Sequence, residues 1–548
     1  MTHELKKLLI SNLCSGLKRK SVTTTSAWAE AYRVMGRPFP GLWRFNHHPW
    51  TREMHDDESE LIIGQKAAQL GFTEVCLNRS FKKIDIDGVS VLYVLPSEGD
   101  ASDFSTSRFD PALELSPHLQ NLFSNVKNIG HKRAGSANLY VRGSRSKSKL
   151  KSIPVGCIVF DEVDEMCQEN ITLAFERMSG QVEQQAFMIS TPTIDNYGIN
   201  SYFKASTQDH FFFRCPHCSK WTELIFPDCL VVTADDPSDK AIRDTHIICK
   251  ECKQLLEHQS KVEWLKDGKW VPTYSDRLSR GFHINQLYSM TVEPWQLATL
   301  YLRAQSNPTD EQEFYNSKLG LTHAVKGAKI TDSMLAEATK DFRMRHDYPR
   351  GGIVCMGIDV GKWLHVEIVQ YVDNRKARTG DVTLDTIARV VWEGKLENFE
   401  DLDRLISQYG IMSCVIDNQP ETREALKFAN RFDGLVKLCI YGQGVNGKLI
   451  KEHSDEPKVT VDRTSWLDTS LGRFKNGSIH LPMDLEEEYK SHIKAPVRVY
   501  KEDVLGNKYG VYVCGNEEDH FAHARNYCEI ALAIAVSQQV VQNIEKVK

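Results

Sequence analysis

Two acidic residues directly follow an apolar run in the first third of the chain. Residues 157–160 are apolar and are followed by Asp161 and Glu162. Such a run is typical of a strand buried in a parallel sheet. A carboxylate at the end of that strand can hold the Mg²⁺ ion of a nucleotide, and the next one can orient the attacking water. The alternative is an ordinary acidic surface turn.

The segment from residue 61 to residue 74 has several features of a phosphate-binding loop. Such a loop needs small residues whose backbone N–H groups wrap the phosphates, a hydroxyl for Mg²⁺ and a lysine for charge. Gly71 and Thr73 occupy the usual places, but Phe72 stands at the lysine position and Lys66 at the first glycine position. We predict that the Lys66 amine reaches the phosphates from the start of the loop. The alternative is a buried turn with a solvated lysine.

Four cysteines form two CxxC pairs, Cys215 with Cys218 and Cys249 with Cys252. Two such pairs can supply four thiolates to one tetrahedral Zn²⁺ ion. Their separation of thirty residues is unusually long, so we expect a long hairpin between them. The alternative is a group of reduced thiols without a metal.

Two further aspartates belong to apolar strand-like runs in the C-terminal half. Asp359 lies within residues 355–361, and Asp417 follows residues 413–416. A buried carboxylate is costly unless it binds a cation. Two aspartates on neighbouring strands resemble the core of RNase H-like nucleases, in which acids hold two Mg²⁺ ions. The alternative is that each aspartate is an acid of a surface turn.

The order of these motifs, together with two further segments, resembles one protein family. The chain also has a tryptophan-containing N-terminal region and the sequence Ser190-Thr191-Pro192-Thr193 after an apolar run. The whole set is similar to the large subunit of tailed-phage DNA packaging terminases, above all the lambda-like family. In that family a loop lysine moved to the front is an accepted variant. The resemblance covers most of the chain.

The resemblance implies an ATP-driven motor joined to an endonuclease. Such a protein translocates viral double-stranded DNA into a procapsid and cuts concatemeric DNA with Mg²⁺ or Mn²⁺. The implied partners are DNA, the small terminase subunit, the portal protein and further copies of the chain in a ring. The implied location is the cytoplasm of the infected bacterium. The nucleotide ligands are then Lys66, Gly71, Thr73 and Asp161, with Glu162 orienting the water.

The third metal ligand of the nuclease site departs from the family pattern. The family has an acid at the start of the final helix, followed by alanine and an aromatic residue, but here His523 takes the acid's place. Asp519 lies one helical turn earlier, on the same face. We predict that Asp519 supplies the carboxylate and that His523 is a second ligand or a proton shuttle. The alternative is that Asp519 only caps the helix.

A basic segment, residues 127–151, contains two candidates for an arginine that acts on a neighbouring subunit's ATP. Such an arginine would stabilise charge on the transferring phosphoryl group. We favour Arg142, which follows a short β-like stretch, over the nearby Arg145. The alternative is a solvated, flexible loop.

The elements that must position these residues indicate two α/β domains. Apolar runs alternate with helical or loop spacers, as in a mostly parallel sheet, at residues 61–63, 89–95, 157–160 and 186–190. We expect a P-loop ATPase domain of the RecA/ASCE-like type, a linker and an RNase H-like nuclease domain. Their expected ranges are 1–345 (with a zinc-ribbon insert at 212–256), 346–352 and 353–548.

Composition narrows the class of protein. A chain of 548 residues exceeds one ordinary core. Hydrophobic and charged contents of 41% and 26% describe a soluble globular protein, without a membrane-length run or a signal-peptide core. Fourteen cysteines in that setting favour reduced thiols and metal ligation. A net charge of −5 excludes a uniformly basic surface but allows local basic patches for DNA.

Two other functions compete with the packaging motor. An ATP-dependent helicase with a fused nuclease should carry a second RecA-like unit with further arginines. A packaging scaffold that has lost catalysis is suggested by Phe72 and by the irregular third acid. A measurement of DNA-stimulated ATPase activity would separate the scaffold from the motor.

Overall fold

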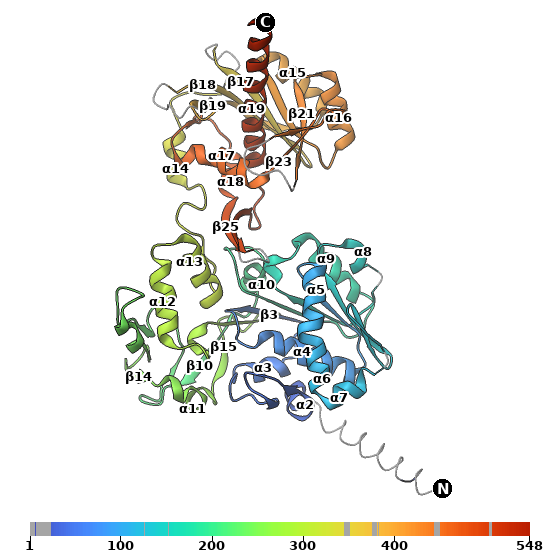
Figure 1. Ribbon diagram of the computed structural model, residues 1–548, viewed down its shortest axis with the longest axis vertical. Helices are drawn as coiled ribbons and strands as arrows, with labels where there is room; N and C mark the ends of the chain where they lie inside the picture. The colour runs from blue at the N-terminus through green and yellow to red at the C-terminus, as the bar shows by residue number, and fades with distance from the viewer. Residues whose placement is uncertain are drawn as a thin grey trace. The chain divides into compact units, whose positions relative to one another are not determined.

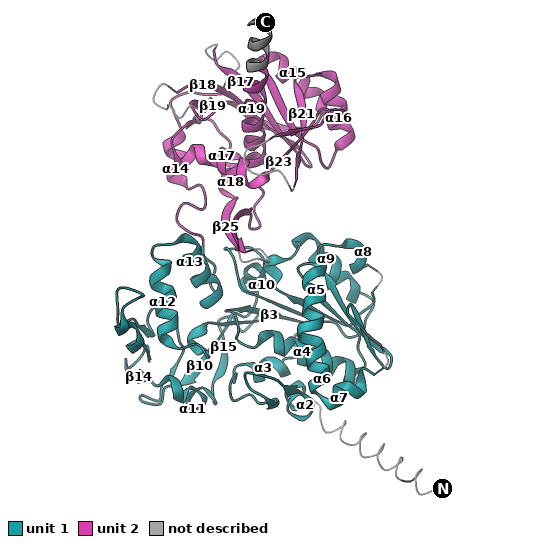
Figure 2. Ribbon diagram, in the orientation of Figure 1, with its two compact units in different colours: residues 1–323 teal, residues 324–548 magenta. Residues whose placement is uncertain are grey.

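The chain forms two compact units, each with its own sheet and core (Figures 1 and 2). They comprise Met1–His323 and Ala324–Lys548. The computed structural model describes residues 6, 24–124, 126–151, 153–344, 351–374, 381, 383–442, 450–502 and 507–547, without the side chains of 126–127 and 539–547. Among the described helices, none is long and apolar enough to cross a membrane.

The first unit is built on an eleven-stranded mixed sheet. Its strands are, in spatial order, β11 (Trp221–Thr222), β10 (Asp209–Arg214), β16 (Arg280–Ile284), β3 (Leu61–Lys66), β9 (Gln185–Ser190), β8 (Cys157–Asp161), β4 (Val91–Leu95), β7 (Ala137–Gly143), β6 (His131–Ala134) and β5 (Val126–Asn128), with β15 (Lys269–Pro272) beside β10. All neighbours from β10 to β7 are parallel. This arrangement agrees with the predicted α/β sheet.

The four predicted apolar runs form adjacent central strands of this sheet. Every residue of β4, β8 and β9 is buried, as expected where helices cover both faces. Three helices pack on these strands: α4 (Phe72–Lys82) on β8 and β9, α5 (Glu98–Phe104) on β4 and β7, and α10 (Ile199–Ala205) on β3 and β9. The carboxyl ends of the parallel strands therefore share one edge.

The remaining elements of the first unit are short. Its other α-helices are α2 (Thr25–Tyr32), α3 (Thr51–Asp56), α6 (Asp110–Leu115), α7 (Pro117–Leu122), α8 (Lys147–Leu150), α9 (Gln168–Phe175), α11 (Lys261–Leu265), α12 (Pro294–Ala304) and α13 (Pro308–Glu313). Two small sheets pair β1 (Val34–Met35) with β2 (Gly41–Leu42), and β12 (Leu230–Val231) with β13 (His246–Ile248) and β14 (Leu255–Leu256).

The second unit contains an eight-stranded mixed sheet and a hairpin. The sheet order is β22 (Lys451–Glu452), β23 (Lys458–Val461), β21 (Val436–Tyr441), β20 (Ser413–Asp417), β17 (Ile353–Val360), β18 (Leu364–Asp373), β19 (Thr386–Leu396) and β24 (Ile479–His480). The hairpin joins β25 (Val497–Glu502) and β26 (Lys508–Val513). The second strand of the unit, β18, runs antiparallel to β17.

Helices lie on both faces of this second sheet. They are α14 (Asp332–Ala338), α15 (Phe399–Tyr409), α16 (Thr422–Arg431), α17 (Arg463–Lys475), α18 (Glu487–Lys494) and α19 (His520–Val547). Cys355 of β17 belongs to the core that contains residues of α17 and α19, and its neighbour Met356 belongs to the core that contains residues of α15 and α16. Successive strand residues point to opposite faces, so the sheet is the middle of three layers.

The boundary between the units differs from the predicted one. Residues 324–344 were expected in the first domain, but Leu335 and Ala338 of α14 are buried in a core of the second unit. A short amphipathic helix does not reveal in sequence which core its apolar face joins. Most of the predicted linker, residues 346–352, lies outside the described residues.

Candidate functional site

The predicted phosphate-binding segment connects β3 to α4. Lys66 is the last residue of β3, and Gly71 precedes α4 with a φ of 85°, a backbone conformation that favours glycine. Neighbouring segments hold the loop, because the N–H of Ala67 donates to Ile284 O at 2.9 Å and that of Ala68 donates to Ser317 O at 2.8 Å. The loop is therefore fixed by backbone contacts at its start.

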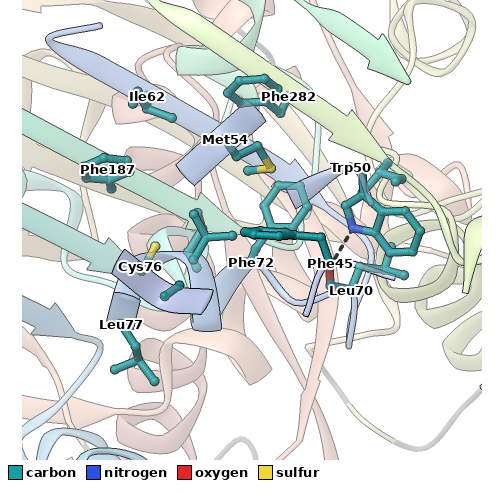
Figure 3. Close-up of a cluster of buried hydrophobic side chains, with 14 of the residues drawn as sticks. Phe45, Trp50, Met54, Ile62, Leu70, Phe72, Cys76, Leu77, Phe187 and Phe282 are labelled. Atoms are coloured by element: carbon teal, nitrogen blue, oxygen red, sulfur yellow. Dashed lines mark hydrogen bonds between the residues drawn. The ribbon is translucent and has the colours of Figure 1, made fainter. Parts of the chain in front are cut away.

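Phe72, at the usual lysine position, is buried in the core (Figure 3). Its ring lies over Gly64 of β3, where an added Cβ would be 2.5 Å from Phe72 Cδ1. Trp50 Nε1 donates to the Leu70 carbonyl at 2.9 Å, which fixes the end of the loop. A lysine at position 72 would point into this apolar cluster, so the site's amine has to come from another position.

Lys66 meets the two acids that end β8. Its Nζ lies 3.0 Å from Glu162 Oε1. Burial alone would lower the pKa of this amine, but the carboxylates of Glu162 and Asp161 outweigh burial and raise it. Lys66 is therefore a cation held among carboxylates and is not the solvated lysine of the alternative interpretation.

Asp161 is buried at the end of β8 beside the loop hydroxyl. Tyr93 Oη donates to Asp161 Oδ2 at 2.7 Å. Burial and the charge of Glu162 raise the pKa of Asp161 to about 6, while Lys66, Tyr93 and a hydrogen bond from Thr73 act in the opposite direction. A nucleotide-bound Mg²⁺ ion is held by a hydroxyl and a carboxylate in phosphate-binding loops, so the roles of Thr73 and Asp161 as its ligands stay a prediction.

The end of β9 connects the second acid to a neighbouring turn. Ser190 Oγ lies 3.4 Å from Glu162 Oε2 and accepts the N–H of Asp164 at 3.2 Å. Asp164 Oδ2 in turn accepts the N–H of Thr193 at 2.7 Å. Burial raises the pKa of Asp164 to about 7. Residues 190–193, the polar segment that carries part of the family resemblance, are thus hydrogen-bonded to the acidic turn that follows β8.

Arg142 lies near the carboxyl end of β7, on the same sheet edge as Lys66 and Asp161. Its guanidinium donates to the carbonyl of Gly130 and, at 2.8 Å, to that of Val141. It also lines a cavity of about 530 Å³ together with Lys149. Its action on a second subunit stays a prediction, as does that of Arg145.

The structure brings the four CxxC cysteines together. The four Sγ atoms lie within 4.8 Å of one another and belong to Cys215, Cys218, Cys249 and Cys252. The first pair follows β10 and the second follows β13. Each pair is followed by a residue of positive φ, Ser219 at 59° and Lys253 at 59°. The two turns are therefore built alike and converge on one point.

In the second unit, Asp359 and Asp417 lie on adjacent parallel strands. Ile358 of β17 is in register with Ile416 of β20, so the two aspartates that follow are neighbours. Burial raises the pKa of Asp417 to about 6, and Asp359 adds to this increase. The predicted proximity of the two carboxylates is thus present.

The start of α19 lies against β17 beside these aspartates. An added Cβ on Gly357 would collide with Ala524 O, so only glycine permits this close approach. His520 Nδ1 lies 2.8 Å from Asp359 Oδ2. Across the sheet, Asp359 is also in register with His365, whose ring stacks on that of His520 at 4.4 Å. Sequence reasoning missed both histidines; the only signal was a histidine in β18 and another beside Asp519.

Asp519 and His523 contact each other at the start of α19, and the charge of His523 also lowers the pKa of Asp417, so their roles as metal ligands stay a prediction. Asp519 Oδ2 lies 3.2 Å from His523 Nε2 and 3.6 Å from Arg463, and it accepts from Cys514 Sγ at 2.9 Å. Burial would raise the pKa of Asp519, but these partners, His523 first, hold it well below its ordinary value. The other ring nitrogen of His523 contacts Tyr441 Oη at 3.0 Å. In the described chain it is therefore His520 that adjoins Asp359, whereas Asp519 and His523 bind each other.

Together these features define a two-unit α/β protein with one lysine–carboxylate site and one paired-aspartate site. Two family models match the chain: "Phage terminase large subunit gpA, ATPase domain" over residues 38–270 and "Terminase large subunit gpA, endonuclease domain" over residues 279–540. The chain belongs to the gpA family of phage terminase large subunits.

Individual relatives agree with this assignment. The chain is 23% identical over 382 residues to the terminase large subunit of Escherichia phage lambda, covering 63% of this chain and 59% of that protein. It is 24% identical to the corresponding subunit of Enterobacteria phage P21, over 60% and 61%. The alignments thus span about three fifths of these relatives. The crystal structure of the HK97 bacteriophage large terminase matches 93% of this chain and 99% of that one, with a TM-score of 0.51 and 12% identity, which indicates a common fold.

Proposed function

We propose that this chain is an ATP-driven DNA translocase joined to a metal-dependent endonuclease that cuts concatemeric viral DNA. The proposal rests above all on the Lys66–Glu162 contact of 3.0 Å at the end of β8, beside Asp161. A charged amine, two carboxylates and a hydroxyl at one edge of a parallel sheet are the groups that ATP hydrolysis requires. The family assignment to ATPase and endonuclease domains supports the same function.

In the first unit, we assign the roles of a P-loop ATPase of the RecA/ASCE-like type. Phosphate oxygens compete with Glu162 for the Lys66 ammonium, which leaves Glu162 free to orient a water. Thr73 and Asp161 fit a nucleotide-bound Mg²⁺ ion, since they supply a hydroxyl and a buried carboxylate. Gly71 allows the turn into α4. Arg142 is the candidate that acts on the ATP of a neighbouring copy.

In the second unit, we assign an RNase H-like nuclease. Asp359 and Asp417 fit a divalent cation, because a buried and a half-buried carboxylate side by side are costly without one. When bound, such an ion activates the attacking water and stabilises the leaving oxygen. Asp519 orients His523 and Arg463 at the start of α19.

The four cysteines fit a structural Zn²⁺ ion, in a ribbon inserted in the first unit. The proposed partners are double-stranded DNA, a small terminase subunit, the portal protein and further copies of the chain in a ring. The proposed location is the cytoplasm of an infected bacterium. A catalytically inactive scaffold and a helicase-nuclease remain the rivals that experiment must exclude.

ATP hydrolysis by the purified chain, measured with and without double-stranded DNA, tests the proposal. We expect turnover that increases with DNA. The matched variant Glu162→Gln should bind a fluorescent ATP analogue like the wild type but turn over ATP about 10²–10³-fold more slowly, because it cannot orient the water. Nucleotide binding without turnover in the wild type would favour the scaffold, and DNA unwinding without translocation would favour the helicase.

A further inference from the structure

Beside Asp359, the second unit holds a group of histidines to which no role has yet been assigned. Asp359, His365 and His520 each offer one ligand atom, and these atoms lie within 4.8 Å of one another. They come from β17, β18 and the first residue of α19. Three separate elements therefore converge on one point.

The side chain of His365 is buried and has no hydrogen-bond partner. It is 3% exposed, and neither ring nitrogen has a hydrogen-bond partner. The nearest acid is Glu488, whose Oε1 lies 3.9 Å from His365 Nε2, beyond hydrogen-bonding distance. A buried imidazole without partners is unfavourable, and such groups call for an explanation, for example an ion.

A second group of ligands continues from the first. His365, Glu488 and His492 also have ligand atoms within 4.8 Å of one another. Glu488 and His492 lie four residues apart on α18 and thus on one helix face. His492 is 5% exposed, and its Nδ1 has no hydrogen-bond partner. The unpaired nitrogens thus extend from Asp359 towards α18.

The ligand types decide the class of metal. Mg²⁺ prefers oxygen ligands in octahedral geometry, whereas imidazole nitrogens suit transition metals such as Zn²⁺, Fe²⁺ and Ni²⁺, and Mn²⁺ is the weakest binder of that series. The ligand atoms lie within 4.8 Å of one another, and the more distant of them would have to move closer to bind one ion, because ligands near 2.0 Å from a tetrahedral ion lie roughly 3.3 Å apart. His520 Nδ1 and Asp359 Oδ2, now 2.8 Å apart, would separate slightly and bind the ion instead of each other.

We propose that Asp359, His365 and His520 bind a divalent transition-metal ion, with Glu488 and His492 adjoining it. The inference deepens the proposed nuclease function, since Asp359 belongs to both. It means that the site is a mixed imidazole–carboxylate centre that binds Mn²⁺ more tightly than Mg²⁺.

Mn²⁺ binding to the purified full chain, without nucleotide, tests this directly. Mn²⁺ is chosen because the thiolates of the four cysteines bind it weakly. We expect pulsed electron paramagnetic resonance to detect nitrogen couplings from imidazole on the bound ion. His365→Gln and His520→Gln should each weaken Mn²⁺ binding at least about tenfold and reduce those couplings. The exposed His453, in the β22–β23 hairpin, provides the matched control, His453→Gln.

The outcomes separate this inference from the nuclease proposal. Circular dichroism and thermal unfolding must first establish that each variant is folded; His520, half-buried, is the safer of the two positions. Bound Mn²⁺ without nitrogen coupling, or unchanged binding in both folded variants, would overturn the histidine site even if DNA is cut. Nitrogen-coupled Mn²⁺ in a chain that cuts no DNA would support the site and contradict the nuclease.

Discussion

The two candidate sites each contain an aspartate of raised pKa, but they differ in the groups that surround it. Each contains an aspartate at the end of a parallel strand whose pKa burial raises to about 6, Asp161 in the first unit and Asp417 in the second. In the first unit the neighbouring cation is Lys66 of the same chain. In the second, the neighbours of Asp359 and Asp417 among the described residues include histidine, tyrosine and backbone groups. The first site thus has a permanent positive charge, and the second depends on protons or metal ions.

This difference has a functional meaning. A built-in ammonium suits a site that receives polyphosphate, because the same cation can transfer from carboxylate to phosphate. A carboxylate–imidazole group suits a site that receives a metal ion, because neutral imidazole and carboxylate are metal ligands. Substitutions of the charged residues therefore test whether the two sites differ in this way.

Lys66→Ala should have the largest effect. It removes the ammonium that faces Glu162 and Asp161 and should lower ATP turnover by about 10²–10³-fold or more. Steady-state phosphate release measures this, with the exposed Lys204→Ala as the control. Turnover near that of the wild type would contradict the proposal that Lys66 supplies the cation of the first site.

Asp417→Asn should lower DNA cleavage to a similar extent, about 10²–10³-fold, and leave ATP turnover unchanged. The carboxylate is a proposed metal ligand of the second unit only. A supercoiled-plasmid nicking assay and the ATPase assay on the same preparation measure both activities. Cleavage that persists in the folded variant would mean that the paired aspartates are not the metal site.

The same variant should change how stability depends on pH in metal-free buffer. The pKa of Asp417 in the folded chain, about 6, lies above the ordinary value of 3.8. Its protonation therefore stabilises the fold at low pH, and this contribution is lost as the pH rises through 6. Asp417→Asn should lose less stability than the wild type between about pH 4 and pH 6, the interval between the two pKa values. Identical thermal unfolding profiles would argue against the raised pKa.

Phe72→Lys tests why the lysine stands at the start of the loop. Position 72 faces the core, so a buried ammonium there should cost more than about 3 kcal/mol of unfolding free energy. The control Phe72→Leu should cost about 1 kcal/mol. Denaturant unfolding compares the two. Rescue of ATP turnover in the double variant with Lys66→Ala would refute the packing argument.

Cys215→Ser tests a third arrangement, in which thiolates alone face the proposed cation. It should reduce the bound zinc from one ion per chain towards none and lower the unfolding temperature, because ligand loss removes folding free energy. Elemental analysis and calorimetry measure this, with Cys167→Ser, outside the cluster, as the control. A wild-type chain without zinc would reject the ribbon.

Asp519→Asn should have the smallest effect on chemistry. Because its carboxylate binds His523 and Arg463, we expect a stability loss of about 1.5–3 kcal/mol and less than about a tenfold change in cleavage. Complete loss of cleavage by a folded variant would restore Asp519 as a metal ligand. Such a result would mean that a third carboxylate binds the metal ion of the second unit.

The sequence by itself determined the parts of the molecule that depend on local patterns. The runs at 61–63 and 157–160 have the composition of buried parallel strands, and both are central strands of the first sheet. The CxxC spacing anticipated that Cys215 and Cys249 meet. The runs that carry Asp359 and Asp417 were likewise predicted as strands and form β17 and β20, because strand composition is a local property.

The direct contacts between side chains within each site follow from the tertiary structure. The Lys66–Glu162 contact depends on the insertion of β9 between β3 and β8, which sequence order does not reveal. The choice of His520 over Asp519 beside Asp359 depends on how close α19 approaches β17 at Gly357. Residues 324–344 joined the second unit because α14 buries its apolar face there. Periodicity specifies which face of an element is apolar, but only packing selects the surface that covers it.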